Sequence, residues 1–340
     1  MDTSILSTLS EIAPDLMEDM ELRTLVLERV AALEPIGRRA LAARLHLAER
    51  EVRAAADALK SAGCLTQSAS GMELTAKGQH LVEAARTVSR GRRTLTTVEL
   101  ALSRKLNVER VCVVRGDADL DAGVLTETAR AAARQIRFLL QDAQVLAVTG
   151  GRTIALTAEA LSLAAPMDIT VVPAQGGVGG GVKTQANTLA ERFAQKLGGD
   201  HRLLHLPDGL SGAAAEELGR LPQVREALEL VRHADVILYG IGRADELAQR
   251  RGLSPTERDA LLAEGAVAEA LGFYFDAQGR MVGTGASLAF HPEEIGRKNR
   301  AAAVAAGRGK AQAILAVCAH HPHKLLVVDE GAALRIMELL

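Results

Sequence analysis

The stretch VTGGRTIALTAEAL, residues 148–161, joins two kinds of sequence pattern around a pair of glycines. A short apolar run ends at Thr149, Gly150 and Gly151 follow, and an alanine-rich segment over 152–164 has the composition of a helix. Glycines allow a tight turn and a close approach of a ligand to the backbone. The free N–H groups at the start of the helix favour an anion there. An ordinary strand-to-helix turn would have the same pattern, so both interpretations stay open.

The same alternation of strand and helix continues from about residue 108 onward. Apolar runs without polar alternation are typical of strands that are buried on both faces of a parallel sheet. Such runs lie at 111–114, 145–149, 169–174, 203–206, 235–241, 301–306 and 325–328. With helical segments between most of them, they predict an α/β domain with a doubly wound, Rossmann-like parallel sheet. Domains of this kind bind ligands beyond the carboxyl ends of their strands.

Three further glycine-bearing turns follow predicted strands: VPAQGGVGGGVKTQ at 172–185, YGIGRADELAQRRG at 239–252 and AAGRGK at 305–310. Five glycines in the first of these favour a loop that binds an anion, because glycine destabilises helices and strands. The second motif carries Gly240 and Gly242. The residues that we single out in these turns are Gln175, Gly176, Gly177, Lys183, Gln185, Arg250 and Lys310. Several such turns at one edge of one sheet predict a ligand with more than one anionic group.

Residues 36–80 have a different character, which predicts a winged helix-turn-helix. Helices are expected over 37–45 and 48–62, and Gly63 takes the left-handed position that ends the second helix. The segment CLTQSASGMELT, 64–75, alternates around a Ser/Gly turn as a two-stranded wing would.

Basic side chains gather on these two predicted helices, although the net charge of the chain is −2. Arg38 and Arg39 begin the first helix, where DNA phosphates would pass, and Arg50 and Arg53 on the second can reach base edges. A small helical hairpin with solvated arginines would look similar without binding DNA, so that alternative stays open.

The domain boundaries follow from these patterns. We expect a winged-helix DNA-binding domain over 1–88, a helical linker over 89–105 and a ligand-binding and oligomerisation domain over 106–340. A helical stretch over 81–105, interrupted near Gly91, is expected to connect the domains.

The sequence offers no convincing catalytic or metal-binding set. The histidines of AHHPHK, 319–324, have a spacing that predicts a solvated turn rather than a metal site. Asp329 and Glu330 follow a predicted strand, where carboxylates bind sugar hydroxyls or cap helices, and Glu269 lies in a predicted helical stretch. An isomerase would need an acid/base pair in the crevice, and none stands out.

The three cysteines show no paired spacing, which indicates a reducing compartment and argues against disulfides and zinc. Because the sequence shows neither a signal peptide nor a long apolar span, we expect a cytoplasmic protein with no membrane partner.

The chain resembles the SorC family of bacterial transcriptional regulators in seven motifs along nearly its full length. They are IGRRALAARL, GMELTAKG, VTGGRT, PAQGGVGGGVKTQANT, GIGRADELAQRRG, AVAEALGFYF and VVDEGAA, in the order of the family. The resemblance implies a winged-helix DNA-binding domain and an effector domain that is similar to sugar-phosphate isomerases but binds without catalysing.

The resemblance further implies a repressor of glycolytic genes that binds operator DNA as a tetramer, with fructose-1,6-bisphosphate as inducer and no cofactor. One phosphate is then expected on Gly150, Gly151, Arg152 and Thr153. Gln185, Arg250, Glu269 and Lys310 match other ligand-contacting positions of the family.

Two positions depart from the family pattern. The first turn usually reads T-G-G-T-T, whereas Arg152 stands here, and the glycine-rich loop usually begins P-A-R-G-G, whereas Gln175 stands here. Lys183 is a candidate to replace the missing arginine. Fructose 6-phosphate or a triose phosphate therefore remains an alternative ligand. A sugar-phosphate isomerase or deaminase with an appended helical domain remains the alternative function.

Overall fold

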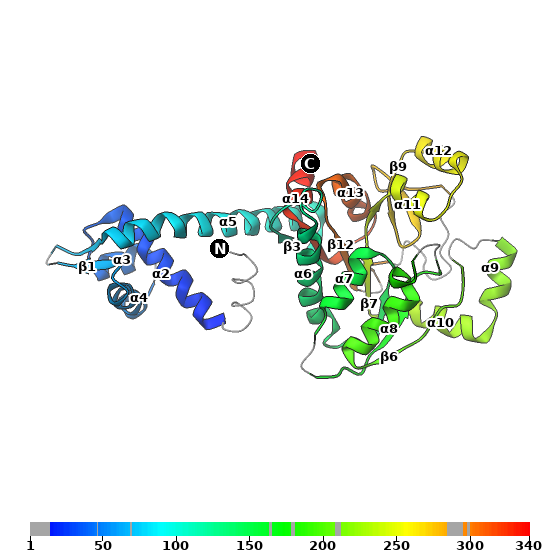
Figure 1. The fold of residues 1–340 in the computed structure, drawn as a ribbon, viewed down its shortest axis with the longest axis horizontal. Helices are drawn as coiled ribbons and strands as arrows, with labels where there is room; N and C mark the ends of the chain where they lie inside the picture. Colours follow the sequence, from blue (N-terminus) through cyan, green and yellow to red (C-terminus); the bar gives the residue numbers. More distant parts are fainter. Residues whose placement is uncertain are drawn as a thin grey trace. The chain divides into compact units, whose positions relative to one another are not determined.

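The computed structural model describes residues 14–45, 47–68, 70–162, 165–177, 181–207, 212–283, 295–297 and 300–340. The chain forms two compact units, Met1–Thr94 and Leu95–Leu340 (Figure 1). The finer division at residues 88 and 105 remains a prediction. No helix in the described part of the chain combines the length and the apolar character needed to cross a lipid bilayer.

The N-terminal unit is a winged helix-turn-helix, as predicted. Its elements are α2 (Pro14–Leu33), α3 (Arg38–Leu45), α4 (Glu49–Ser61), β1 (Leu65–Gln67), β2 (Met72–Leu74) and the first part of α5 (Ala76–Leu106). Gly63 follows α4 with a φ of +73°, in the left-handed region expected there. β1 and β2 pair antiparallel, and Ile36 forms an isolated bridge to Met72 beside them.

One apolar cluster holds this unit together. Val52, Ala56 and Leu59 recur at helical spacing along α4 and are buried, so one face of that helix packs inward. Leu41 of α3 and Met72 of β2 belong to the same cluster.

The interruption expected near Gly91 is wrong, because α5 runs as one helix of 31 residues from Ala76 to Leu106. A single glycine costs a helix only about 1 kcal/mol. The alanine, leucine and arginine residues around it are good helix formers, which explains why the helix continues.

A seven-stranded parallel sheet forms the centre of the C-terminal unit. Its strand order is β3-β13-β12-β7-β4-β5-β6. These strands are β3 (Val108–Val114), β4 (Val145–Val148), β5 (Thr170–Pro173), β6 (Asp200–His201), β7 (Val236–Gly240), β12 (Arg300–Ala305) and β13 (His323–Asp329). The doubly wound α/β prediction is confirmed, since apolar clusters cover both faces of the sheet.

Helices lie on the two faces in separate groups (Figure 1). One cluster contains residues of α6 (Ala122–Leu140), α7 (Arg152–Ala160) and α8 (Ala186–Leu197). The other contains residues of α10 (Pro222–Arg232), α13 (Ala311–His320), α14 (Glu330–Leu339) and the end of α5. The helix predicted over 152–164 is therefore present but ends at Ala160.

The strand predicted at 203–206 is wrong, because the edge strand β6 covers only Asp200 and His201. Leu204 and Leu206 are buried, which explains the apolar signal. The side chain of Asn187 accepts from the N–H of Leu204 and donates to its carbonyl at 2.9 and 3.0 Å. These bonds occupy the backbone groups that a sheet would otherwise pair.

A second, antiparallel sheet of four strands, β11-β10-β9-β8, was not predicted. It contains β8 (Gly242–Arg243), β9 (Ala266–Ala270), β10 (Phe273–Asp276) and β11 (Met281–Val282), and the chain between β8 and β9 forms α11 (Ala244–Arg250) and α12 (Pro255–Ala263). The predicted helix around Glu269 is thus wrong. Leu271 and Gly272 both have positive φ and form the two-residue turn between β9 and β10.

The solvated turn predicted at 319–324 is also wrong. His321 and His323 are 5% and 3% exposed, and the Nε2 atom of each lies 2.6 and 2.5 Å from the hydroxyl of Tyr239. Burial lowers the pKa of His321 well below its ordinary value and that of His323 to about 4. The imidazoles are therefore neutral parts of the core.

Candidate functional site

The order of the strands creates a switch point between β4 and β7. From β4 the chain proceeds outward through β5 and β6, whereas from β7 it proceeds in the opposite direction through β12 and β13. Crevices at such points are where open α/β sheets bind ligands. The turn at Gly150 leaves β4, and the turn at Gly242 leaves β7. Because β4, β5, β7 and β12 are parallel, the expectation that the glycine-bearing turns share one edge is confirmed.

Gly150 is the point at which three segments of this edge meet. A Cβ atom on it would lie 2.6 Å from the carbonyl oxygen of Thr184, 3.3 Å from Nε2 of Gln175 and 3.3 Å from the amide nitrogen of Ala186. The β4 turn, the end of β5 and the start of α8 thus leave no room for a side chain. Gly151 follows with a φ of +112° and donates its N–H to the same carbonyl at 2.9 Å.

The start of α7 presents a positive end at this turn. The carbonyl of Gly151 accepts the N–H of Ala155, so the preceding helical N–H groups have no partner within the helix. The side chain of Arg152, the first residue of α7, is exposed, and Thr153 is buried. This arrangement provides backbone donors and one exposed cation for an anion.

A second basic group lies at the ends of β7 and β12. Lys310 closes the short 3-10 helix η3 (Arg308–Lys310) and precedes α13. Its pKa is lowered, mainly by burial and further by the charge of Arg250, while Glu246, Asp119 and Asp329 oppose that shift. The charge of Arg250 thus acts on Lys310, which relates two predicted ligand residues to one another.

Asp119 and Arg243 belong to the same edge, and the sequence analysis missed both. Asp119 accepts the N–H of Gly309 at 2.7 Å, and Arg243 pairs with Asp245 at 2.6 Å. A Cβ on Gly309 would lie 3.3 and 3.7 Å from Asp119 and Arg243. Their position in the sequence could have revealed them, because each residue follows a predicted strand of the parallel sheet.

Glu269 is placed differently from the other predicted residues. It is buried in β9, opposite Gly242 of β8, and its Oε1 accepts from Arg251 and from the N–H of Gly272, both at 2.8 Å. Its ion-pair partner is therefore Arg251, the neighbour of the predicted Arg250. A contact of Glu269 with a ligand remains a prediction.

The glycine-rich loop is described in part, since residues 178–180 lie outside the described residues. The N–H of Gly177 donates to the carbonyl of Leu206 at 2.7 Å, and Gly176 is buried. The predicted helix start near Val182 is confirmed as the start of a 3-10 helix, and the α-helix α8 begins at Ala186. Lys183 lies exposed in the 3-10 helix η1 (Val182–Thr184), and Gln185 is the N-cap of α8.

Asp329 and Glu330 take structural positions. The Asp329 carboxylate accepts from the N–H groups of Ala332, Ala118 and Gly307 at 3.0, 2.7 and 2.9 Å, and so caps α14 and fixes two loops. Burial raises the pKa of this carboxyl group, against those hydrogen bonds. For Asp329 the contacts support the interpretation as a helix cap, whereas Glu330 accepts the N–H of Gly116 at 3.0 Å.

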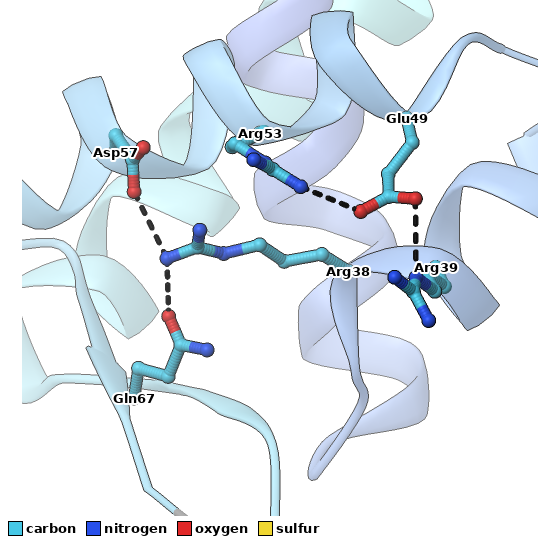
Figure 2. Close-up of polar contacts among 6 residues, drawn as sticks. All are labelled: Arg38, Arg39, Glu49, Arg53, Asp57 and Gln67. Atoms are coloured by element: carbon cyan, nitrogen blue, oxygen red, sulfur yellow. Dashed lines mark hydrogen bonds and ion pairs between the residues drawn. The ribbon is translucent and has the colours of Figure 1, made fainter.

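Figure 2 shows three of the four arginines that we expected at a DNA surface, and each has an internal partner. Arg38 reaches Asp57 of α4 at 3.0 Å and Gln67 of β1 at 2.5 Å. It thus connects α3 to α4 and to β1.

The other pairs centre on one carboxylate. Glu49 accepts from Arg39 at 3.2 Å and from Arg53 at 2.8 Å, one on each oxygen (Figure 2). Arg50 is exposed, and within the described residues no polar partner of its side chain is found. DNA contacts by these arginines remain predictions.

Both units match known families. Residues 20–89 match the CggR N-terminal DNA-binding domain, and residues 93–338 match the Sugar-bind family of sugar-binding domains. A DNA-binding winged helix followed by a sugar-binding α/β domain defines a sugar-responsive transcriptional regulator.

The particular family follows from the relatives. The chain is 34% identical to the central glycolytic genes regulator of Bacillus subtilis over 328 residues, 96% of each chain, and 34% identical to that of Priestia megaterium over 97% of each chain. A SorC-family regulator from Enterococcus faecalis is similar in structure, with 32% identity and a TM-score of 0.65 over 71% of this chain and 99% of its own. The chain belongs to the SorC family of bacterial transcriptional regulators.

A full-length structure shows the same fold. The sorbitol operon regulator SorC of Klebsiella pneumoniae, at 17% identity, covers 93% of this chain and 99% of its own with a TM-score of 0.65. Because the relatives are regulators, the isomerase alternative is set aside, and the chain is a transcriptional regulator rather than an enzyme.

Proposed function

We propose that this regulator represses glycolytic genes and is released from its operator by a sugar bisphosphate, with fructose-1,6-bisphosphate as the natural effector. The observation that carries the proposal is the presence of two separate cationic groups at one edge of the sheet. One is the start of α7 with Arg152, and the other is Lys310 with Arg250. Two phosphates on one sugar would satisfy both.

The two departures from the family pattern fit this ligand. Arg152 adds a cation directly at the first phosphate position, and Gln175 leaves a neutral amide beside Gly150. The number of positive charges is kept while their place changes. A guanidinium at the helix start pairs with a phosphate through two parallel hydrogen bonds, so Arg152 strengthens the first phosphate position.

The glycolytic target rests on the two relatives named central glycolytic genes regulator, and the repressor role is part of the proposal. The relatives are similar to this chain over nearly their whole length, so both the DNA-binding and the sugar-binding domains are included. Assembly as a tetramer on operator DNA belongs to the same proposal.

Thermal unfolding of the full chain with sugar phosphates tests the ligand. A ligand at about 100 times its Kd adds roughly 2.7 kcal/mol to the free energy of unfolding. Fructose-1,6-bisphosphate is expected to raise the Tm more than fructose 6-phosphate or dihydroxyacetone phosphate at equal concentration. Lys310→Gln should remove most of that rise.

Lys196→Gln is the matched control, because Lys196 is an exposed lysine in the last turn of α8. This variant should keep the full rise in Tm. If the monophosphate stabilises the chain as well as the bisphosphate does, and Lys310→Gln leaves both effects intact, the proposed ligand is wrong.

A further inference from the structure

The carboxylate of Glu49 forms ion pairs with Arg39 and Arg53, which lie on the two helices that contact DNA in a helix-turn-helix. Arg39 comes from the first turn of α3 and Arg53 from the second turn of α4, and Glu49 is the first residue of α4. In this class of domain the N-terminal end of the second helix enters the major groove, while the preceding helix crosses the backbone. Arg39 is therefore expected at the DNA backbone, and Arg53 at the entrance to the major groove.

These contacts are too exposed to be needed for folding. The side chains of Arg39 and Arg53 are 88% and 56% exposed. Ion pairs at such sites contribute about 0.2–1 kcal/mol. The start of α4 has a separate stabilising contact, since Glu51 accepts the N–H of Ala48 at 3.0 Å. Glu49 thus affects the charge that the domain presents more than its stability.

A DNA phosphate makes the same type of contact with arginine as the Glu49 carboxylate does. With Glu49 in place, the three side chains present one net positive charge instead of two, and each arginine must exchange a carboxylate oxygen for an oxygen of the DNA. We propose that Glu49 is an internal competitor for Arg39 and Arg53 that limits the affinity of the domain for DNA.

A limit of this kind serves regulation. Coupling between an effector site and a distant site is typically 1–3 kcal/mol, so a sugar can release the regulator only if DNA binding is not too tight. The inference depends on DNA binding by the winged domain and is independent of which sugar binds.

Glu49→Gln tests the proposal in the full-length chain with two fluorescent duplexes. One has a fixed arbitrary sequence, and the other is the tightest duplex enriched from a random pool by the wild-type chain. We expect Glu49→Gln to bind both duplexes about 3- to 10-fold more tightly, with a log–log salt slope steeper by about one, as one additional phosphate contact would give.

Glu51→Gln is the matched control. It removes the same charge from the same turn of α4, and glutamine can still accept the N–H of Ala48. Its tightening should be clearly smaller. In a chain that carries Arg39→Gln and Arg53→Gln, Glu49 has neither arginine to pair with. Adding Glu49→Gln to that chain should therefore change the affinity for DNA no more than adding Glu51→Gln does.

Equal effects of Glu49→Gln and Glu51→Gln would overturn the proposal, since general charge alone would then explain the change. Weaker binding by Glu49→Gln would also overturn it and would assign Glu49 to direct DNA contact or to positioning of the arginines. A wild-type chain that binds neither duplex would instead contradict DNA binding itself. A Tm equal to that of the wild type in each variant would show that the binding measurements compare folded proteins.

Discussion

Tyr239 and Tyr274 are both buried in the sugar-binding domain, but their hydroxyl groups have different surroundings. The Tyr239 hydroxyl contacts two imidazoles, and since it carries one hydrogen, it donates to one ring and accepts from the other. The Tyr274 hydroxyl has no hydrogen-bond partner within the described residues. Because an unpaired buried polar group costs about 1–3 kcal/mol, the same substitution should have different effects at the two positions.

We expect Tyr239→Phe to lower the free energy of unfolding by about 1–3 kcal/mol, because both imidazoles lose their partner. Tyr274→Phe should be neutral or slightly stabilising. Denaturant titration of the two variants measures the difference. Equal losses would contradict the assignment of the Tyr239 hydroxyl as a shared partner.

A second prediction at the scale of one residue concerns Gly150. Gly150→Ala places a methyl group 2.6 Å from a backbone carbonyl oxygen, and the backbone cannot move aside without shifting the start of α8. We expect at least a tenfold weaker affinity for fructose-1,6-bisphosphate, measured by calorimetry, which corresponds to about 1.4 kcal/mol. Gly181→Ala is the control, because its Cβ would meet nothing within 4 Å. Retained binding by Gly150→Ala would show that the turn does not contact the ligand.

At the scale of elements, His323 at the start of β13 makes the free energy of unfolding depend on pH. His323 has a pKa of about 4 in the folded chain, lowered mainly by burial, against an ordinary value of 6.5. The unfolded chain therefore binds a proton between these values and the folded chain does not. The contribution to stability is complete above pH 6.5 and is lost as pH falls toward 4, by about 3 kcal/mol in total.

Unfolding titrations between pH 4 and 7 measure that loss. His323→Gln should give a shallower dependence of the free energy of unfolding on pH than the wild type. An unchanged slope in His323→Gln would mean that His323 titrates at its ordinary pKa.

The strands of the parallel sheet were predictable because continuous apolar runs identify them, and β4, β7 and β12 lie within a residue or two of their expected bounds. The antiparallel sheet was not. AVAEA over 266–270 has the alanine content of a helix, and it becomes β9 only because Leu271 and Gly272 turn the chain back onto an aromatic strand.

At the scale of the whole molecule, long-range contacts explain why some residues of the candidate site could not be predicted from the sequence. The glycine turns were visible as local motifs. The bond from Gly309 to Asp119 joins residues that are 190 positions apart, and the charges that shift the pKa of Lys310 lie on α11, after β3 and at the end of β13. Only the strand order, which places β13 between β3 and β12 and places β7 on the other side of β12, brings such groups together.

The two domains of a sugar-responsive regulator must influence one another through a coupling free energy, and that coupling is reciprocal. If fructose-1,6-bisphosphate weakens binding of the enriched duplex by some factor, the duplex must weaken sugar binding by the same factor. We expect a factor within the usual range of about 5- to 150-fold. Lys310→Gln should reduce the factor toward one and leave DNA affinity without sugar unchanged, because Lys310 belongs to the sugar-binding domain. Fluorescence anisotropy and calorimetry on the same samples measure the two factors. A sugar that binds tightly but leaves DNA affinity unchanged would show that it binds both states of the regulator equally and is not the effector.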